Sequence, residues 1–301
     1  MSGLSAEQLA ARRNAIGGSD CAAALGLSKW KTMRQLFHEK RGELPLDDED
    51  TLEKRLGLHL EPFVRQWYAE ETQFVVQQPA GTLVHPDYPF LVGHIDGFSK
   101  TPAGMRGYEG KWSVRSVGWG LEGTDQIPID YFFQVQHYLM LTKWPVWDVV
   151  CLVGARFLRH QVHADESLSQ YVLDGELEFI RRVRENDPPP LDSEHPTALE
   201  LMKRVFPGTD GSIIPAPPEA LEWRVELLEA VALENEAKKA KNGLRAKMLE
   251  LMGSAALLEF PDGQCLRRQR VDKCAYTVAA SSYMDLRFVA GRRSRSRHSG
   301  R

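Results

Sequence analysis

The sequence predicts an α/β protein in which a mixed central sheet is flanked by helices. After several short strand-like runs come a helical pattern at 131–141 and two further strand patterns at 146–153 and 156–163. A helix that crosses between two strands lets them pair in parallel, whereas tight turns give antiparallel pairs. The hydrophobic fraction of 43% and the charged fraction of 26% are ordinary for globular chains, which excludes disorder over the whole length.

The first 42 residues predict short helices separated by a tight turn. Thr32 and Gln35 have the spacing of a capping box at the start of one helix. The turn at 16–20, Ile-Gly-Gly-Ser-Asp, leads into a small apolar helix that Ser19 or Asp20 would cap. We therefore expect an exposed helix start in this turn.

The middle of the chain changes from a helical to a strand-like pattern. Apolar residues recur at helical spacing from Leu52 to Trp67. Short runs rich in β-branched and aromatic residues then predict strands at 73–77, 81–85, 90–98 and 107–114. A last helix of this part is predicted at 166–184.

The C-terminal third predicts an appendage. Proline-rich stretches suggest a linker, a long amphipathic pattern at 219–252 predicts one helix, and Phe260-Pro-Asp-Gly263 predicts the turn of a hairpin. Six arginines and no acids lie between Arg287 and Arg301, a tail that we expect to be disordered and to favour an anionic partner. The expected division is a core at 1–187, a linker at 188–218, the helix and hairpin at 219–286 and the tail at 287–301.

Several classes of protein are excluded by simple patterns. The four cysteines show no CxxC and no paired spacing, which argues against a disulfide framework, a zinc ribbon and an iron–sulfur cluster. No stretch approaches 18 uncharged apolar residues, and the start lacks the apolar region of a secretion signal. We expect a cytoplasmic protein that does not enter a membrane.

The residues with the clearest chemistry lie in a predicted hairpin. Asp96 and Glu109 would stand directly opposite each other in an antiparallel pair that turns at Thr101-Pro-Ala-Gly104. Lys111 would point to the same face as Glu109, because side chains alternate along a strand. The alternative is a solvated surface hairpin with a Glu–Lys pair. Asp96, however, lies in an apolar run, where a carboxylate needs a partner or a metal ion.

Two carboxylates and an ammonium group suit metal-dependent phosphoryl chemistry. Mg²⁺ prefers a few hard oxygen ligands and leaves room for water and phosphate. Lys111 can orient the water and stabilise negative charge, whereas an arginine would not exchange a proton. His94 and His137 are expected to be structural, since Mg²⁺ prefers oxygen to nitrogen.

Five short motifs follow one another along the first half of the chain. They are an arginine followed by Ile16-Gly-Gly-Ser-Asp20, then Gly57-x-x-x-Glu61-Pro62, Gly93-His-Ile-Asp-Gly97, Glu109-Gly-Lys111 and Gln134-Val-Gln-His-Tyr138. Each motif is weak alone, but their order resembles that of the YqaJ-type viral recombinase family, which includes phage lambda exonuclease, within the PD-(D/E)XK nuclease superfamily. The resemblance covers roughly residues 10–160.

This resemblance implies a PD-(D/E)XK restriction-endonuclease-like core and a set of site residues. Asp96 and Glu109 would ligate one or two Mg²⁺ ions, which Mn²⁺ could replace, with the carbonyl of Gly110 and the helical Glu61 completing the site. Lys111 would position the attacking water. Ser19 and Arg12 would hold the 5′ phosphate, with Arg13 as the alternative arginine; Gln134, Gln136 and Tyr138 would support the site or contact DNA, Gln136 being slightly favoured over Gln134.

The resemblance also implies a function and partners. It implies an exonuclease that digests linear double-stranded DNA from the 5′ end and leaves 3′ single strands for phage or prophage recombination in a bacterial host. It further implies a single-strand annealing protein as partner and a trimeric ring around DNA. Two alternatives stay open, a RecB-like or Cas4-like single-strand nuclease and an inactive DNA-binding module.

Overall fold

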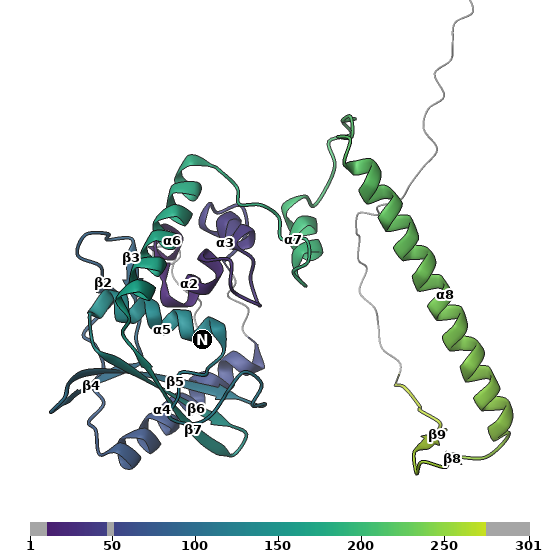
Figure 1. Cartoon of the computed structure of the whole chain (residues 1–301), viewed down its shortest axis with the longest axis horizontal. Helices are drawn as coiled ribbons and strands as arrows, with labels where there is room; N and C mark the ends of the chain where they lie inside the picture. The colour runs from purple at the N-terminus through teal and green to yellow at the C-terminus, as the bar shows by residue number, and fades with distance from the viewer. Residues whose placement is uncertain (1–10, 47–50, 275–301) are drawn as a thin grey trace, which may run out of the picture. The chain divides into compact units, whose positions relative to one another are not determined.

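The structure is a computed structural model that describes residues 11–46 and 51–274 (Figure 1). The chain divides into two compact units, Met1–Pro207 and Gly208–Arg301. The Arg-rich tail expected at 287–301 lies outside the described residues. The first unit contains all of the candidate site residues.

A four-stranded mixed sheet forms the centre of the first unit, as the sequence predicted. Its strands follow the order β4-β5-β6-β7, in which only the β5–β6 pair is parallel. Helix α5 (Ile129–Thr142) connects these two strands, so it is the crossover that a parallel pair requires. The strands are β4 (Gly97–Thr101), β5 (Gly104–Ser113), β6 (Val146–Val153) and β7 (Arg156–His163).

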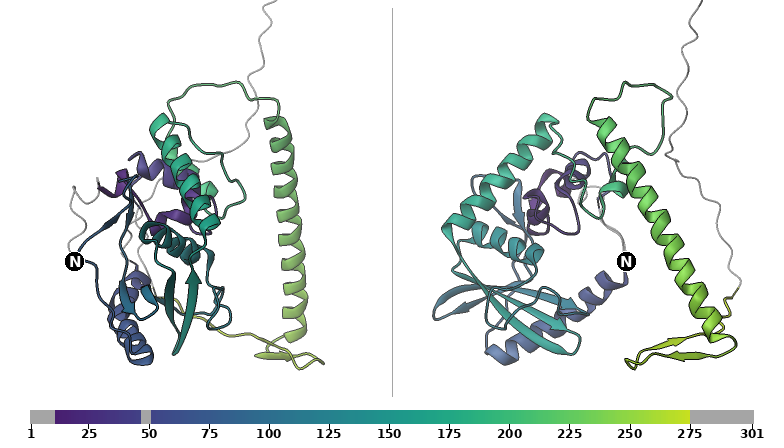
Figure 2. Two further views of the ribbon diagram at one scale, coloured as in Figure 1. Left: turned by 60° about the vertical axis from the view of Figure 1, so that its left-hand side comes forward. Right: turned by 45° about the vertical axis from the view of Figure 1, so that its right-hand side comes forward.

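Helices cover both faces of this sheet (Figures 1 and 2). On one face, Val135 and Leu139 of α5 pack with Val149 of β6. On the other face, Val64 and Tyr68 of α4 (Leu52–Thr72) pack with Val150 and other strand residues. Since both faces are covered, β6 reads as a nearly continuous apolar run rather than an alternating one.

A second, three-stranded sheet lies beside the first and has the order β1-β3-β2. The single strand predicted at 90–98 is wrong, because it is divided between β3 of this sheet and β4 of the other. The strand predicted at 73–77 is reduced to one bridge between Gln77 and Phe98. The three strands are β1 (Ile16–Gly17), β2 (Leu83–Val84) and β3 (Leu91–Gly93).

Three further helices pack around the small sheet. The Thr32 side chain caps α3 by accepting from the backbone N–H of Gln35 at 3.0 Å, as predicted. The cap predicted for the preceding helix is wrong, since Gly17 is its N-cap and Ser19 lies in its first turn. The Asp20 carboxylate instead accepts from the Gly17 N–H. The helices are α2 (Gly18–Ala24), α3 (Met33–Lys40) and α6 (Glu166–Glu185).

The remaining elements include the predicted long helix and hairpin. Helix α7 (Ala198–Val205) lies within the proline-rich range of the sequence. In the second unit, α8 (Ala220–Met252) is followed by a hairpin of β8 (Leu257–Glu259) and β9 (Cys265–Arg267). Within the described parts of the chain, no helix combines the length and the apolar character needed to span a membrane.

Candidate active site

The hairpin of β4 and β5 has the predicted register. Gly97 pairs with Tyr108 and Thr101 pairs with Gly104, the alignment on which the opposition of Asp96 and Glu109 depended. Asp96 stands immediately before β4, at the break between the two sheets. Its Oδ2 accepts a hydrogen bond of 2.9 Å from the backbone N–H of Gly110.

Gly110 allows this close approach of strand and carboxylate. A Cβ at this position would lie 2.8 Å from Oη of Tyr108 and 3.7 Å from Oδ2 of Asp96. A side chain here would displace one of these groups. The glycine between Glu109 and Lys111 is therefore required by packing at the site.

Glu109 is held by two groups from different elements. Lys111 Nζ lies 2.6 Å from Glu109 Oε1, and the amide of Gln134 on α5 donates to the same oxygen at 2.8 Å. Gln134 also donates to the hydroxyl of Tyr138, which donates in turn to the carbonyl of His94 at 2.9 Å. Glu109 is only 2% exposed, so the alternative of a solvated surface hairpin is wrong.

A cavity of about 730 Å³ opens over these groups. Asp96, Gly110 and Lys111 line it from the hairpin, and Glu61 lines it from α4. The carboxylate of Glu61 forms an ion pair with Arg65, one turn further along the same helix. The carboxylates of Asp96 and Glu61 and the ammonium group of Lys111 thus line a single hollow, and the buried Glu109 contacts Lys111.

Burial and like charge set the protonation of this group. Burial, together with the charges of Asp96 and Glu61, raises the pKa of Glu109 to about 8, although Lys111 opposes the shift. Burial would lower the pKa of Lys111, but the carboxylates of Glu109 and Asp96 outweigh it and raise the pKa above its ordinary value. Lys111 is therefore charged at neutral pH.

The donor set fits a hard divalent cation. Oε2 of Glu109 is buried and has no hydrogen-bond partner among the described residues. A cation beside it would satisfy this oxygen and would offset the repulsion between Glu109 and Asp96. The residues available to hold such an ion are Asp96, Glu109, the carbonyl of Gly110 and Glu61.

A second cavity, of about 610 Å³, brings together the residues predicted for the 5′ phosphate. Arg12 and Ser19 both line it and both are exposed. Arg13 is not among its lining residues, and its guanidinium lies beside Gly42 instead. Of the two arginines left open by the sequence, the geometry therefore favours Arg12.

Buried Lys40 holds in place the segment that lines this second cavity. Its ammonium group donates to the carbonyls of Arg12 and Ala15 and to Asp20 Oδ2, at 2.7, 2.5 and 2.7 Å. Burial would raise the pKa of Asp20, but Lys40 outweighs it and lowers that pKa. The Asp20–Lys40 pair thus holds both ends of the segment in which Ser19 is presented.

The two glutamines of α5 lie on different faces of the helix. Gln134 reaches Glu109, whereas Gln136 is buried and its Oε1 has no hydrogen-bond partner among the described residues. The slight preference for Gln136 as the site contact is therefore reversed. Their separation of two positions, about 200° around a helix, accounts for the difference.

Tyr131 also lines the site, although it was not among the residues predicted from the sequence. Tyr131 lines the first cavity, and Lys111 Nζ lies 4.8 Å from the centre of its ring. The signal was present in its spacing, since Tyr131, Gln134 and Tyr138 follow one another at i, i+3 and i+7 on α5. Arg65, four residues after Glu61, was missed in the same way.

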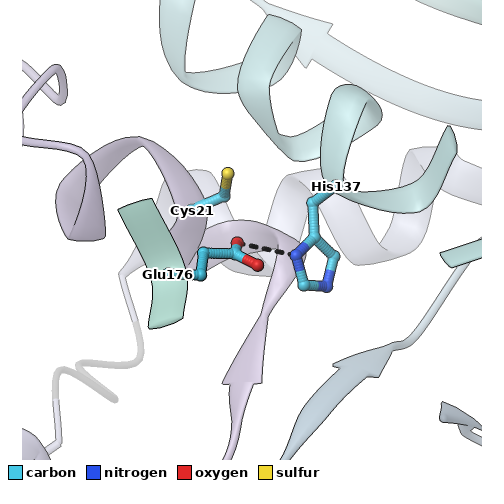
Figure 3. Close-up of side chains that lie close together, drawn as sticks. All are labelled: Cys21, His137 and Glu176. Carbon is cyan, nitrogen blue, oxygen red and sulfur yellow. Dashed lines mark hydrogen bonds and ion pairs between the residues drawn. The ribbon is translucent and has the colours of Figure 1, made fainter. Parts of the chain in front are cut away.

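Helix α5 also contributes His137 to a second buried polar group (Figure 3). One ligand atom each of Cys21, His137 and Glu176 lie within 4.8 Å of one another, close enough to hold a metal ion. His137 is already engaged on both sides, with Nδ1 2.7 Å from Glu176 Oε1 and Nε2 donating to the carbonyl of Val92 at 2.9 Å.

The protonation of this group favours a structural role. Burial alone would lower the pKa of His137, but the Glu176 carboxylate raises it. Burial and Glu176 raise the pKa of the Cys21 thiol well above its ordinary value. An imidazolium paired with a carboxylate, beside a protonated thiol, ties α2, α5 and α6 together, whereas metal binding needs the deprotonated thiolate.

Comparison with known proteins gives matches at the level of sequence and of structure. A curated relative, "Uncharacterized protein YqaJ" of Bacillus subtilis (strain 168), is 26% identical over 251 residues, which cover 80% of this chain and 77% of the relative. An alkaline exonuclease (LHK-Exo) from Laribacter hongkongensis is 18% identical, with a TM-score of 0.46 over 60% of this chain and 94% of that chain. A phage related exonuclease from Haemophilus somnus 129PT is 10% identical, with a TM-score of 0.43 over 57% of this chain and 96% of that chain.

The family comparison covers the part of the chain that holds both cavities. Residues 7–144 match the family model of the YqaJ-like viral recombinase domain. This range begins before Arg12 and ends after Tyr138, so it includes every residue singled out for the site. Residues 7–144 of this chain are therefore similar to the YqaJ-like viral recombinase domain.

Proposed function

We propose that this protein is a Mg²⁺-dependent deoxyribonuclease that digests linear double-stranded DNA from the 5′ end and leaves 3′ single strands. The observation that carries the proposal is a cavity lined by Asp96, Lys111 and Glu61, with the buried Glu109 in contact with Lys111. The match of residues 7–144 to the YqaJ-like viral recombinase domain supports DNA as the substrate and recombination as the purpose.

In the proposed mechanism, the carboxylates of Asp96 and Glu109 would hold the cation, with the Gly110 carbonyl and Glu61 completing its surroundings. A bound Mg²⁺ would supply polarisation of the scissile phosphate and a lower pKa for a neighbouring water. The charged Lys111 would orient the attacking water and stabilise the negative charge that develops during attack. Gln134 keeps Glu109 in place through its amide, and Tyr138 fixes Gln134 in turn.

The second cavity accounts for the proposed choice of end. Arg12 and the Ser19 hydroxyl would bind the terminal 5′ phosphate, since a guanidinium and a hydroxyl are good donors to phosphate oxygens. The Asp20–Lys40 pair would keep this segment in place. A duplex whose 5′ end was held there would present a nearby phosphodiester to the metal site.

We further propose that the protein acts in a bacterial cytoplasm as part of a phage or prophage recombination system. The 3′ strands would pass to a single-strand annealing protein, and a trimeric ring would keep the enzyme on its substrate. These partners follow from the family resemblance of the motifs. The chemistry of the site itself requires only DNA and a divalent cation.

The proposal is tested with a linear duplex labelled separately at each 5′ and 3′ end. Digestion is measured with Mg²⁺, with Mn²⁺ and with EDTA, beside a closed circular duplex and a single strand. Release of 5′ nucleotides from the linear duplex, dependent on the cation, is the expected result. Cleavage of circles or preference for single strands would favour a RecB-like or Cas4-like nuclease, and DNA binding without any cleavage would favour an inactive module.

Matched variants separate the site from the fold. Glu61→Gln should slow cleavage strongly, because it removes a carboxylate that lines the cavity. Glu70→Gln is the control, since Glu70 lies on the same helix, is exposed, does not line this cavity and accepts a hydrogen bond from Gln66 of that helix. Equal activity of the two variants would remove Glu61 from the proposed mechanism.

A further inference from the structure

Trp30 is a large exposed aromatic side chain in the loop between α2 and α3 of the first unit. Its exposed fraction is 51%, although tryptophan is on average among the well-buried residues. An exposed indole offers a broad apolar face together with one N–H donor. The surroundings of this ring therefore determine which ligand is within its reach.

The Trp30 ring stands directly beside the wall of the first cavity. Its centre lies 5.5 Å from the ring centre of Tyr131, which lines that cavity. The Tyr131 ring centre lies in turn 4.8 Å from Lys111 Nζ. Because nucleotides repeat at about 3.4 Å along each strand of a duplex, these two contacts place Trp30 within about three nucleotide steps of Lys111.

The loop that carries Trp30 is held at several points. The Ser28 hydroxyl accepts hydrogen bonds from the backbone N–H groups of Trp30, at 3.1 Å, and of Lys31, at 3.3 Å. The Lys31 ammonium forms an ion pair of 2.7 Å with the buried Glu39 of α3. A ring that is presented on a fixed loop loses little conformational entropy when it binds a ligand.

Positive charge lies next to the exposed ring. Lys29 is exposed, and its Nζ lies 5.0 Å from the centre of the Trp30 ring. Arg115 is also exposed and lines the first cavity together with Tyr131. An aromatic face beside basic groups suits an unpaired nucleotide, because the ring stacks on the base while the cation meets the phosphate.

Packing alone accounts for only part of this arrangement, as a comparison with Trp119 shows. The Trp119 ring also contacts Tyr131, at 5.8 Å between ring centres, but it is only 8% exposed. Trp119 thus belongs to the hydrophobic core. Trp30 contacts the same tyrosine and leaves half of its surface open to a ligand.

The end of a DNA strand supplies a base that this ring can reach. Inside a duplex, both faces of each base are covered by its neighbours, so a side chain can stack on a base only after costly unstacking. A terminal base has one open face and is freed at a lower cost. An enzyme that works at an end therefore brings such a base to the cavity.

We propose that Trp30 is a stacking platform for one base of the cleaved strand, within three nucleotides of its 5′ end. Tyr131 supports the ring from the side of the cavity, and Lys29 binds the adjoining phosphate. The inference rests on the proposed function, since it requires a DNA end in the first cavity. Because every base has an aromatic face, this contact holds the strand without selecting a sequence.

The test is the affinity of the full-length protein for 5′-phosphorylated duplexes in which one nucleotide is abasic. Binding is measured by fluorescence anisotropy in EDTA, so that the duplex stays intact. Trp30→Ala should weaken binding of the complete duplex by about 10-fold or more, because it removes the stacking surface. On the duplex that lacks the stacked base, at one of the first three positions of the 5′-ended strand, Trp30→Ala should cause no further loss.

Two further variants separate stacking from a general effect of the substitution. Trp30→Phe keeps an aromatic face and should bind within roughly 3-fold of the original protein. Tyr171→Ala is the matched control, since Tyr171 is an aromatic residue of the first unit that is 49% exposed and lines neither the first nor the second cavity. Its affinity for every duplex should equal that of the original protein.

Three results would overturn the proposal. Trp30→Ala could bind as tightly as Tyr171→Ala, it could lose the same factor on every abasic duplex, or its loss could vanish only when the abasic nucleotide is in the complementary strand. In each of these cases DNA binding by the original protein leaves the proposed nuclease function standing. An original protein that binds no DNA would overturn that function, and the stacking platform with it.

Discussion

Two buried carboxylates contact neighbouring residues of helix α5, but their surroundings differ. Gln134 donates to Glu109, and burial together with the charges of Asp96 and Glu61 raises the pKa of Glu109 to about 8. His137, three residues further along α5, forms an ion pair with Glu176. Each has one buried oxygen without a hydrogen-bond partner among the described residues.

The difference lies in charge balance and access. The Glu176 group contains one carboxylate and one imidazolium, is fully buried and needs nothing more for neutrality. The Glu109 group contains three carboxylates and Lys111, and it opens into a cavity. A buried acid that is balanced by the protein stabilises the fold, whereas one left with excess negative charge beside a cavity is suited to bind a cation.

Asp96→Asn should produce the largest effect, a loss of cleavage on the order of 1,000-fold or more, because it removes a carboxylate from the proposed metal site. The amide oxygen can still accept from the backbone N–H of Gly110, so the fold should persist. Cleavage rate and circular dichroism are measured together. Retained cleavage by a folded Asp96→Asn protein would contradict the assignment of Asp96 to the proposed metal site.

Glu176→Gln should lower the free energy of unfolding by about 3 kcal/mol, because it leaves the buried His137 without its counter-charge. Glu109→Gln should leave the metal-free protein about equally stable at neutral pH, because a pKa of about 8 keeps the Glu109 carboxyl largely protonated there. Urea unfolding without divalent cations measures both. Equal losses of stability in the two variants would contradict the distinction between a stabilising Glu176 and a cation-binding Glu109.

The pH dependence of stability sharpens the same contrast. The pKa of Glu109 is higher in the folded than in the unfolded protein. Its stabilising contribution to the free energy of unfolding is therefore complete below about pH 4.5 and is lost as pH rises to about 8. The metal-free protein should therefore lose a few kcal/mol of stability across this window, and Mg²⁺ should restore it. Urea unfolding at successive pH values tests this, and Glu109→Gln should flatten the curve.

The smallest effect is expected at the start of α2, where Ser19 and Cys21 lie two residues apart. Ser19→Ala should slow digestion of 5′-phosphorylated ends by about 10-fold, the loss of one hydrogen bond to phosphate, and should affect 5′-hydroxyl ends less. Cys21 lies in the buried group with His137 and Glu176. Cys21→Ala should therefore alter stability without changing the preference for 5′-phosphorylated over 5′-hydroxyl ends. The ratio of the two digestion rates is the measurement, and an unchanged ratio in Ser19→Ala would remove the phosphate role.

Much of the fold followed from local patterns. The strands at 146–153 and 156–163 were predicted with their observed bounds, because each is bounded by turn residues and has a clear pattern. The register of the β4–β5 hairpin could be predicted from the turn at 101–104, which fixes every pair along the ladder. Because this register follows from the turn alone, the sequence was sufficient to bring Asp96, Glu109 and Lys111 together.

The rest depended on contacts between distant segments. The division of 90–98 between two sheets arises because β3 pairs with β1 and β2, and no local signal marks that break. The choice between Gln134 and Gln136 depended on how α5 is rotated against the sheet. The cap of α2 was missed because the Asp20 carboxylate is held by Lys40, twenty residues away.

The tip of the β4–β5 hairpin has a practical consequence. Thr101 and Gly104 close the ladder at an exposed turn, where a Cβ at Gly104 would meet no other atom within 4 Å. Residues added between them lengthen the turn and leave the pairing of Gly97 with Tyr108 unchanged. A peptide tag or a fluorophore could therefore be inserted there without shifting Asp96, whereas one residue inserted between Asp96 and Thr101 would turn that carboxylate away from Glu109.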